Sequence, residues 1–315
     1  MIKLAIVSPC YNEEDVLDTS AKRLTELFDQ LIEKSIITKD SFVLYVNDGS
    51  KDKTWDIIKD LNKHNRYIYG LSLAGNVGHQ NAIMAGMMKV KDICDACITI
   101  DADLQDDLSA IEKMIAEKEK GVDVVYGVKI SRSGDSAPKR ISAQLFYKIQ
   151  KAMGVKAVYN HADFRLMSKK ALNYLANYPE RNLYLRGIIP QMGLKSSTVD
   201  DYINPRLAGN SKYTLKKMLN LAFDGITSFS TVPISIIIGL GIISLFISFI
   251  MVIHIFYSWA KGNNVPGWTE MMTSLWFIGS VIMISIGVVG LYVGKIYVES
   301  KSRPLWLEDE FISQD

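Results

Sequence analysis

Up to about residue 230, short apolar runs alternate with segments in which apolar side chains recur at helical spacing. The short runs predict strands at residues 2–8, 42–46, 67–73, 96–100 and 122–126. The segments between them predict helices at residues 13–33, 54–64, 81–90 and 108–120. Strands and helices in alternation imply parallel strands joined by crossover helices. We therefore expect a doubly wound, Rossmann-like α/β domain with a mostly parallel sheet over residues 1–210.

Two long uncharged stretches dominate the last third of the chain. Residues 233–257 contain His254 as their single Asp, Glu, Lys, Arg or His, and residues 271–294 contain none of these. Each stretch is longer than the roughly 20 apolar residues that a helix needs to cross a bilayer core. We therefore expect two transmembrane helices within residues 232–298.

The connector between these stretches, residues 260–270, is short and rich in turn residues, so the two helices should form an antiparallel hairpin. Its one cation is Lys261. Lysine and arginine instead flank the outer ends of the hairpin, at Arg206, Lys212, Lys216, Lys217, Lys295, Lys301 and Arg303. The positive-inside rule therefore predicts a multi-pass protein of the inner (plasma) membrane. Its catalytic domain and both termini, including a tail over residues 299–315, should be cytoplasmic.

Two further segments have an amphipathic pattern. One covers residues 139–153, and the other covers residues 211–231, directly before the first predicted span. In both, lysines or arginines adjoin an apolar stripe. Such helices lie in the membrane surface or pack their apolar face on a domain. The sequence leaves both arrangements open for either segment.

Composition narrows the classes of function. The formal net charge of the 315 residues is +2, so bulk charge gives no support to nucleic-acid binding. Three cysteines and a start that leads directly into a predicted strand point to a reducing compartment. Cys94 and Cys97 form a Cys-x-x-Cys pair, but no second pair or nearby histidine completes a metal site. We therefore interpret both as buried residues of the core.

Polar clusters follow three of the predicted strands at their carboxyl ends, which is where open α/β sheets bind ligands. The first contains Tyr11 and Glu13, and an aromatic ring beside a carboxylate can stack on a nucleobase and accept its N–H groups. Taken alone, Asn12 or Glu13 fits a helix cap equally well. The second places Asp48 before a glycine that permits a tight turn, so its carboxylate should point into the same crevice.

The third cluster is Asp101-Ala-Asp103-Leu-Gln105, at the end of the fourth predicted strand. Alternate residues of an extended segment project to the same side, so Asp101 and Asp103 can converge on one divalent cation, with Gln105 adding a neutral oxygen. Mg²⁺ or Mn²⁺ held there would bridge two phosphates and stabilise a diphosphate leaving group. An isolated Asp-x-Asp usually lies in a solvated loop, and it is the position at the strand end that makes the metal prediction specific.

Taken together, these motifs resemble the family 2 glycosyltransferases, which have the GT-A fold. The similarity is closest to the polyprenyl-phosphate branch, with its dolichol-phosphate mannosyltransferases and bacterial bactoprenol glucosyltransferases. The motifs that carry it are Pro9-x-Tyr-Asn-Glu13, Asn47-Asp-Gly-Ser-x-Asp-x-Thr54, Gly75-Asn-x-Gly-His-Gln-x-Ala82, Asp101-Ala-Asp-x-Gln105, Val125-Tyr-Gly127, Lys139-Arg140, Asp163-Phe-Arg-Leu166, Leu185-Arg-Gly187 and Arg206-x-Ala-Gly-x-Ser-Lys-Tyr213. Each motif is weak alone, but their order and spacing, with paired C-terminal spans, are specific.

The resemblance implies a role for each candidate site residue. The nucleotide would be held by Pro9, Tyr11, Glu13, Asp48 and Asp101. The metal and the diphosphate would be held by Asp101, Asp103 and Gln105, and the reaction centre would contain Asp103, Asp163 and Arg165. Contacts with the acceptor phosphate or the departing diphosphate would come from Lys129, Arg132, Arg140, Arg206 and Lys212. Lys129 stands where this branch commonly has an arginine, and it lacks the bidentate fork, so Lys129 and Arg132 are assigned this role together.

Simpler interpretations stay open for several of these residues. Arg140 and Lys212 fit interfacial cations attracted to anionic lipid. Asp163 fits a helix N-cap or a buried partner of Arg165. His79 also belongs to a motif, but a turn or packing role is the default for it.

The resemblance implies an enzyme that transfers a single sugar, with inversion, to undecaprenyl or another polyprenyl phosphate at the cytoplasmic membrane face, for a cell-envelope glycan or lipid. The acceptor phosphate is mostly ionised near neutral pH and can attack the anomeric carbon without a strong base. UDP-glucose is the first choice of donor, and GDP-mannose, UDP-N-acetylhexosamine and UDP-linked formylated aminoarabinose stay open.

Other classes fit less well. A processive polysaccharide synthase is disfavoured because the chain has no Gln-x-x-Arg-Trp motif and too few predicted spans for a channel. A non-catalytic membrane scaffold or transporter subunit would not need aligned aspartates. The sequence leaves the oligomeric state open, with a homotetramer as a first guess.

Overall fold

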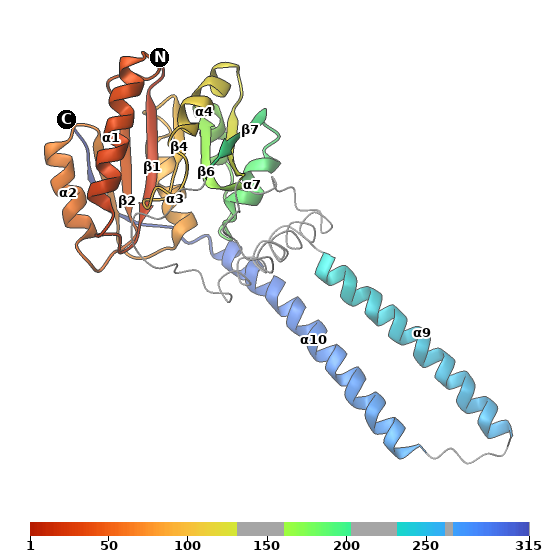
Figure 1. Cartoon of the computed structure of the whole chain (residues 1–315). Coiled ribbons are helices and arrows are strands. Elements are labelled where there is room, and N and C mark those ends of the chain that lie inside the picture. Colours follow the sequence, from red (N-terminus) through yellow and green to blue (C-terminus); the bar gives the residue numbers. More distant parts are fainter. Residues whose placement is uncertain (131–160, 203–231, 262–266, 315) are drawn as a thin grey trace.

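The structure is a computed structural model that describes residues 1–130, 161–202, 232–261 and 267–314. One eight-stranded sheet forms the centre of the N-terminal domain (Figure 1). Its strands are β1 (Leu4–Cys10), β2 (Phe42–Asn47), β3 (Ile68–Leu73), β4 (Ala96–Thr99), β5 (Val124–Lys129), β6 (His161–Ser168), β7 (Ser196–Asp201) and β8 (Glu308–Ile312). The helices around it are α1 (Leu17–Glu33), α2 (Thr54–His64), α3 (His79–Val90), α4 (Ala110–Glu119), α6 (Lys169–Leu175) and α7 (Leu185–Gln191).

The sheet has the strand order β7-β5-β6-β4-β1-β2-β3-β8. β1 pairs in parallel with β2 and β4, β2 with β3, and β5 with β7. All nine strands and helices predicted for the domain are present, and no end differs by more than four residues from its prediction. β6 runs antiparallel to β4 and β5, and β8 runs antiparallel to β3. The sheet is therefore mixed, with a parallel core, and the alternating pattern did not predict three of its strands, β6, β7 and β8.

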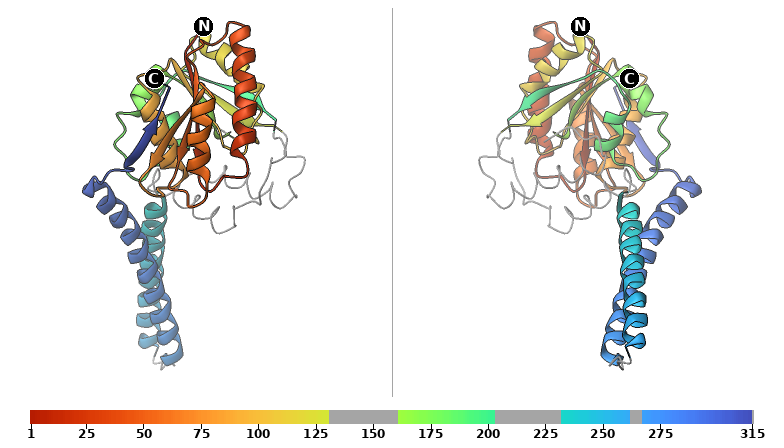
Figure 2. Two further views of the ribbon diagram at one scale, coloured as in Figure 1. Left: turned by 90° about the vertical axis from the view of Figure 1, so that its left-hand side faces the viewer. Right: turned by 90° about the vertical axis from the view of Figure 1, so that its right-hand side faces the viewer.

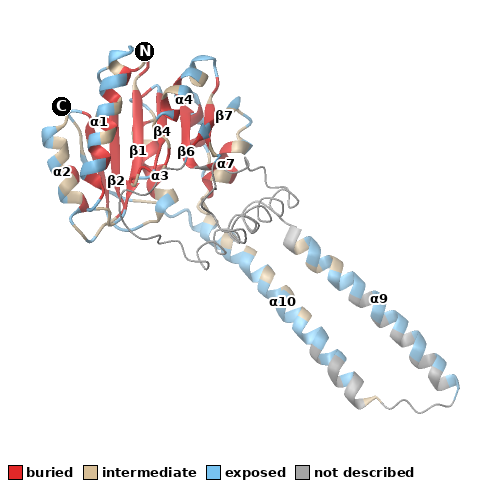
Figure 3. Cartoon of the chain, viewed as in Figure 1, coloured by how far each residue is buried: buried red, intermediate tan, exposed pale blue. Residues whose placement is uncertain are grey.

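Two apolar layers hold the helices against the two faces of the sheet (Figure 3). α1, α2 and α4 cover one face, and α3, α6 and α7 cover the other. In α1, buried Leu17, Leu24 and Leu31 recur at seven-residue spacing, which makes one apolar stripe. α3 lies very close to the sheet because Gly86 faces it. A Cβ at this glycine would lie 2.4 Å from Val7 Cγ1.

The three cysteines are free and buried in the same layers. This confirms the interpretation of Cys94 and Cys97 as core residues.

The C-terminus returns to the sheet, whereas the sequence analysis expected a separate tail over residues 299–315. Strand β8 lies along the edge of β3, and Ala74 N donates to Leu307 O at 3.0 Å just before it. Lys89 Nζ lies 2.6 Å from Glu308 Oε2, and Trp55 Nε1 donates to Glu310 Oε2 at 3.1 Å. The end of the expected tail is thus an edge strand whose acidic residues Glu308 and Glu310 contact the domain.

Two long helices project from the domain, α9 (Val232–Ala260) and α10 (Trp268–Lys301), and they lie side by side (Figures 1 and 2). Their described side chains are mostly exposed, in contrast to the buried strands (Figure 3). Within the part of the chain that the structure describes, one segment, Phe277–Lys301, is long and apolar enough to cross a membrane, and Ile234–Ile243 is a shorter apolar stretch. The hairpin of two spans and its orientation stay predictions.

The predicted amphipathic helix over residues 211–231, the amphipathic segment at 139–153 and the expected domain boundary near residue 210 lie outside the described residues.

Candidate active site

Hydrogen bonds connect the loop that follows β1 to the loop that follows β2. Asn12 N donates to Ser50 Oγ at 3.0 Å, and Asn12 Oδ1 accepts from Lys51 N at 2.9 Å. Glu13 N donates to Thr54 Oγ1 at 2.9 Å. Asn12 has φ 53°, a left-handed conformation that asparagine tolerates better than most residues. Asn12 therefore joins two loops, and it is not the cap of α1.

These loops present the residues predicted to hold a nucleoside. Pro9 is buried in β1, whereas the side chain of Tyr11 is 39% exposed at the rim. Glu13 is partly exposed in the same loop. The structure thus leaves an aromatic ring accessible beside a carboxylate, above the carboxyl ends of β1 and β2.

Asp48 joins the loops after β2 and β3. It is buried, and its two carboxylate oxygens accept from Val77 N at 2.7 Å and Gly78 N at 3.1 Å. Burial raises the pKa of Asp48, and the two N–H groups offset this only in part. Gly78 has φ 88°, so the turn that brings its N–H to Asp48 favours glycine. Asp48 therefore shapes the loop from Gly75 to Gly78, a role that the sequence analysis missed.

The Asp101–Gln105 segment is a tight turn after β4. Leu104 has φ 46°, and its N–H donates to Asp101 O at 3.1 Å. Ala102 and Leu104 are buried, whereas Asp101 is exposed and Asp103 and Gln105 are partly exposed. The predicted alternation of sides is therefore present, although the backbone turns instead of continuing the strand. Within the described ranges, no group of three or more His, Cys, Asp or Glu side chains is arranged to hold a metal ion.

A cluster of charged side chains surrounds Asp163, near the start of β6. Asp163 Oδ1 lies 2.5 Å from Arg165 Nη2, and Asp163 Oδ2 lies 2.9 Å from Arg186 Nη2. Arg186 Nε also donates to Asp163 Oδ1, at 3.3 Å. His79 Nε2 lies 3.4 Å from Asp163 Oδ2 and 3.6 Å from Asp101 Oδ1. The cluster therefore connects the metal candidates to the reaction centre that the resemblance implied.

This arrangement fixes the charge states of the cluster. Burial would raise the pKa of Asp163, but Arg186, His79 and Arg165 hold it well below its usual range. Burial lowers the pKa of Arg165, a side chain with no exposed surface. Its Nη1 has no hydrogen-bond partner among the described residues. Burial also acts to lower the pKa of His79, but the carboxylates of Asp163 and Asp101 outweigh this and raise it.

Asp163 is thus a buried, ionised partner of Arg165, the alternative that the sequence left open, and it is not a helix cap. Two guanidinium groups share this one carboxylate, so the cluster favours anionic ligands. Arg186 and His79 are the two members of the cluster that the sequence analysis did not assign. The available signal was their membership of the Leu-Arg-Gly and Gly-His-Gln motifs.

The predicted phosphate-binding cations lie partly outside the described residues. Lys129 is at the end of β5, and its Nζ lies 3.4 Å from Asp106 Oδ1. Burial raises the pKa of Asp106 to about 8, which Lys129 opposes. Asp201, at the end of β7, accepts from Asp107 N at 2.8 Å and holds the loop that follows Gln105. The remaining predicted cations, Arg132, Arg140, Arg206 and Lys212, are outside the described residues.

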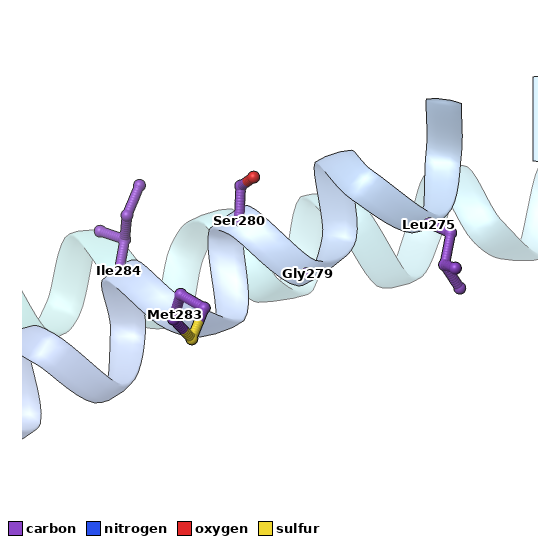
Figure 4. Close-up of a pocket in the computed structure, with 5 residues that line it drawn as sticks. All are labelled: Leu275, Gly279, Ser280, Met283 and Ile284. Carbon is purple, nitrogen blue, oxygen red and sulfur yellow. The ribbon is translucent and has the colours of Figure 1, made fainter. Parts of the chain in front are cut away.

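A separate hollow lies on the projecting helix α10 (Figure 4). It is lined by Leu275, Gly279, Ser280, Met283 and Ile284. Its lining has one hydroxyl and no charged group, so it offers nothing to a nucleotide sugar. The charged cluster around Asp163, at the carboxyl ends of the parallel strands, is therefore the candidate active site.

The chain is similar in sequence to known glycosyltransferases. The family model described as "Glycosyl transferase family 2" matches residues 5–175. The chain is 46% identical over 306 residues to the uncharacterized glycosyltransferase YkoT of Bacillus subtilis (strain 168), covering 97% of this chain and 91% of that protein. It is 37% identical over 311 residues to the bactoprenol glucosyl transferase of Shigella phage SfX, covering 97% and 98%. It is 36% identical over 313 residues to the prophage bactoprenol glucosyl transferase homolog of Escherichia coli (strain K12), again covering 97% and 98%.

Proposed function

The chain belongs to the family 2 glycosyltransferases, and from that premise we propose that it transfers one sugar from a nucleotide diphosphate donor to the phosphate of a polyprenyl lipid. The observation that carries this proposal is the extent of the match to the phage enzyme, which covers 97% of this chain and 98% of that protein and so includes the apolar helix α10 of this chain. A soluble acceptor would not require that helix. We take undecaprenyl phosphate as the acceptor and UDP-glucose as the first choice of donor, because the relatives are named as bactoprenol glucosyl transferases.

The donor nucleoside binds at the two hydrogen-bonded loops that follow β1 and β2. The exposed ring of Tyr11 offers a stacking surface for the base. The carboxylates of Glu13 and Asp48 offer acceptors for its N–H groups, since each carboxylate oxygen has two lone pairs and those of Asp48 each accept one backbone hydrogen bond.

Asp101 and Asp103 suit a divalent cation in chemistry and exposure. Both are carboxylates with accessible surface, and Gln105 follows them with an amide oxygen. Mg²⁺ is commonly bound by one or two carboxylates together with substrate phosphates, so a larger protein cage is not required. A Mg²⁺ or Mn²⁺ bound there would neutralise the charge that develops on the diphosphate leaving group.

The acceptor phosphate serves as its own nucleophile. Its second pKa is about 6, so near neutral pH it carries the charge needed for attack. A phosphate oxygen forms a bond to the anomeric carbon while the bond from that carbon to the donor diphosphate breaks, and the electron pair leaves with the diphosphate. One displacement inverts the anomeric centre, so an α-linked donor gives a β-linked product.

Asp163 acts in this reaction as the anchor of two guanidinium groups. A general base must be able to take up a proton near the working pH, and the pKa of Asp163 is held well below its usual range. Arg165 and Arg186 remain cationic and face Asp163 from two sides. Arg186 is partly exposed, so it can contact a substrate phosphate and help to keep the substrates in line for the displacement. Arg165 has no exposed surface, so it contributes the field of its buried charge and no direct contact.

The chemistry requires the catalytic domain to face the cytoplasmic surface of the membrane, where the nucleotide sugars are made. α10 then holds the charged cluster near the headgroup layer in which the acceptor phosphate lies. We assign the product to cell-envelope glycan or lipid modification on the same basis.

The deciding experiment incubates the purified full chain with undecaprenyl phosphate in lipid vesicles and with each of UDP-glucose, GDP-mannose, UDP-N-acetylglucosamine and UDP-linked formylated aminoarabinose. Mass analysis should find one hexose on the lipid phosphate with UDP-glucose, and none with the Asp103→Asn variant. A product from another donor in the panel would keep the reaction and change the sugar. If none of the donors gave a lipid product, the proposed function would be wrong.

A further inference from the structure

The carboxylate of Glu299 connects the last turn of α10 to the catalytic domain. Glu299 Oε1 accepts hydrogen bonds from Arg181 N at 2.9 Å and Asn182 N at 2.8 Å, and Oε2 also lies 2.9 Å from Arg181 N. The side-chain amide of Asn182 donates to Glu299 Oε1 at 2.8 Å and to Lys295 O at 3.3 Å. Three N–H donors from one short segment thus converge on one side chain of the apolar helix.

The backbone of Glu299 also takes part in the end of α10, which follows Lys301. Ser302 has a left-handed conformation with φ 47°, and its N–H donates to Glu299 O at 3.1 Å. After this stop the chain leads to β8, which is paired with β3. The C-terminal segment is therefore attached to the domain by β8 whether or not Glu299 is present, so the Glu299 contacts determine the orientation of α10 more than its attachment.

The segment held by Glu299 leads directly into the charged cluster. Leu185 N, three residues after Asn182, donates to Gln80 Oε1 at 2.8 Å. The next residue is Arg186, which contacts Asp163 through two nitrogens. Gln80 in turn follows His79, another neighbour of Asp163. The contact of Asn182 with α10 is therefore four positions along the chain from Arg186, a guanidinium of the reaction centre.

We propose that Glu299 is a positioning residue that fixes the reaction centre relative to the phosphate of an acceptor embedded in the membrane. This rests on the proposed function for the identity of the acceptor. Leu185 and Arg186 have their own partners within the domain, so loss of the Glu299 contacts should leave the cluster assembled. What should be lost is the fixed relation between that cluster and the apolar helix.

Glu299→Gln is the sharpest perturbation, because it keeps the size of the side chain and replaces one accepting oxygen by an NH₂ group that faces other donors. With undecaprenyl phosphate in vesicles, transfer should fall about tenfold or more, as expected for the loss of hydrogen bonds to a charged group. With a short-chain, water-soluble prenyl phosphate in detergent, the rate should stay at the wild-type value. The affinity for UDP, measured by calorimetry, should also be unchanged.

Two further variants test whether the effect belongs to this contact. Asn182→Leu removes the side-chain donor and keeps Glu299, so it should cause a smaller loss, and the double variant should lose no more than Glu299→Gln alone. Glu308→Gln is the matched control, because Glu308 lies in the same C-terminal segment and its carboxylate forms a surface ion pair with Lys89. It should behave as wild type. An equal loss with both acceptors, or no loss in vesicles, would overturn the proposal.

A structural readout separates this proposal from the proposed function. Spin labels on Asn177→Cys and Ser302→Cys, both at exposed positions, report the distance between the domain and the end of α10. The full chain in vesicles should give a narrow distance distribution, and Glu299→Gln should broaden it. If the wild-type chain transferred no sugar to lipid, the function would fail while this measurement still decided the role of Glu299. An unchanged distribution in Glu299→Gln would refute that role for any substrate.

Discussion

Replacing Asp163 with asparagine should impair stability and catalysis together, unlike a change at any exposed carboxylate of the site. The substitution keeps the shape of the side chain and removes the charge that faces Arg165 and Arg186. Arg165 has no exposed surface, so its guanidinium would then be buried without a counterion. Removing one partner of a buried ion pair costs about 3 to 5 kcal/mol, because an uncompensated charge is left behind.

The asparagine oxygen still accepts one hydrogen bond, so we expect the lower end of this range, about 3 kcal/mol. For a domain of this size, 1 kcal/mol shifts the thermal midpoint by roughly 2 to 4 °C, so the midpoint should fall by roughly 6 to 12 °C. Sugar transfer should fall to background. Asp103→Asn is the matched control, since its partly exposed side chain should affect transfer and leave the midpoint where it is.

The dependence on pH gives a second test. The pKa of Asp163 is lowered in the folded state, so its contribution is present at every pH above its unfolded value of about 3.9 and is lost only as the pH falls through the lower folded value. The gap in midpoint between wild type and Asp163→Asn should therefore persist from about pH 5 to pH 8. It should narrow as the pH rises through the raised pKa of His79, because Asp163 stabilises the protonated imidazole and this contribution is lost with the proton. Adding Arg165→Met to Asp163→Asn should recover part of the lost stability, because no buried charge then remains unpaired. A double variant that loses the sum of both single effects would refute the explanation, as would a wild-type midpoint in Asp163→Asn.

Three other predictions follow from the site and the helices. EDTA should abolish transfer and Mg²⁺ or Mn²⁺ should restore it, and Asp103→Asn should stay folded but inactive; full activity in EDTA would remove the metal from the mechanism. A cysteine at Asn264 should react with an impermeant thiol reagent applied outside the cell, whereas labelling of Ser313→Cys from outside would invert the orientation. Arg206→Ala should weaken transfer without weakening UDP binding in calorimetry, and Tyr11→Ala should weaken UDP binding directly; equal losses of UDP binding would contradict separate donor and acceptor regions.

The alternation of apolar runs was sufficient to predict the first five strands and four helices, because each element buries one face and its pattern is local. It did not predict β6, β7 and β8. β6 and β8 run antiparallel to their neighbours, so they do not belong to the alternation of parallel strands and crossover helices. β8 was expected as part of a tail, and its residues Glu308 and Glu310 make side-chain contacts with the domain. Their partners, Lys89 and Trp55, are more than two hundred residues away in sequence, so no local pattern could connect them.

The reversed direction of β6 also explains which site residues the sequence could place from its own pattern. Ligands were expected after the carboxyl ends of parallel strands, and Tyr11, Asp48 and Asp101 do lie there. Because β6 is antiparallel, its beginning lies beside the end of β4, with Thr99 in register with Arg165. Asp163, near the start of β6, therefore lies at the same end of the sheet as the residues that follow the parallel strands. Only the resemblance to a family predicted its place in the site.

The presence of a carboxylate at the centre of a site for two polyanions has a physical reason. Arg165 and Arg186 approach the same point, and without Asp163 they would repel each other, with Arg165 fully buried. A buried guanidinium is tolerated only when it is paired and hydrogen-bonded. One carboxylate pairs with both arginines and still leaves the three groups with a net positive charge. A stronger neutralisation, with one carboxylate for each arginine, would give an equally stable domain that had no remaining attraction for the diphosphate or for the phosphate of the acceptor.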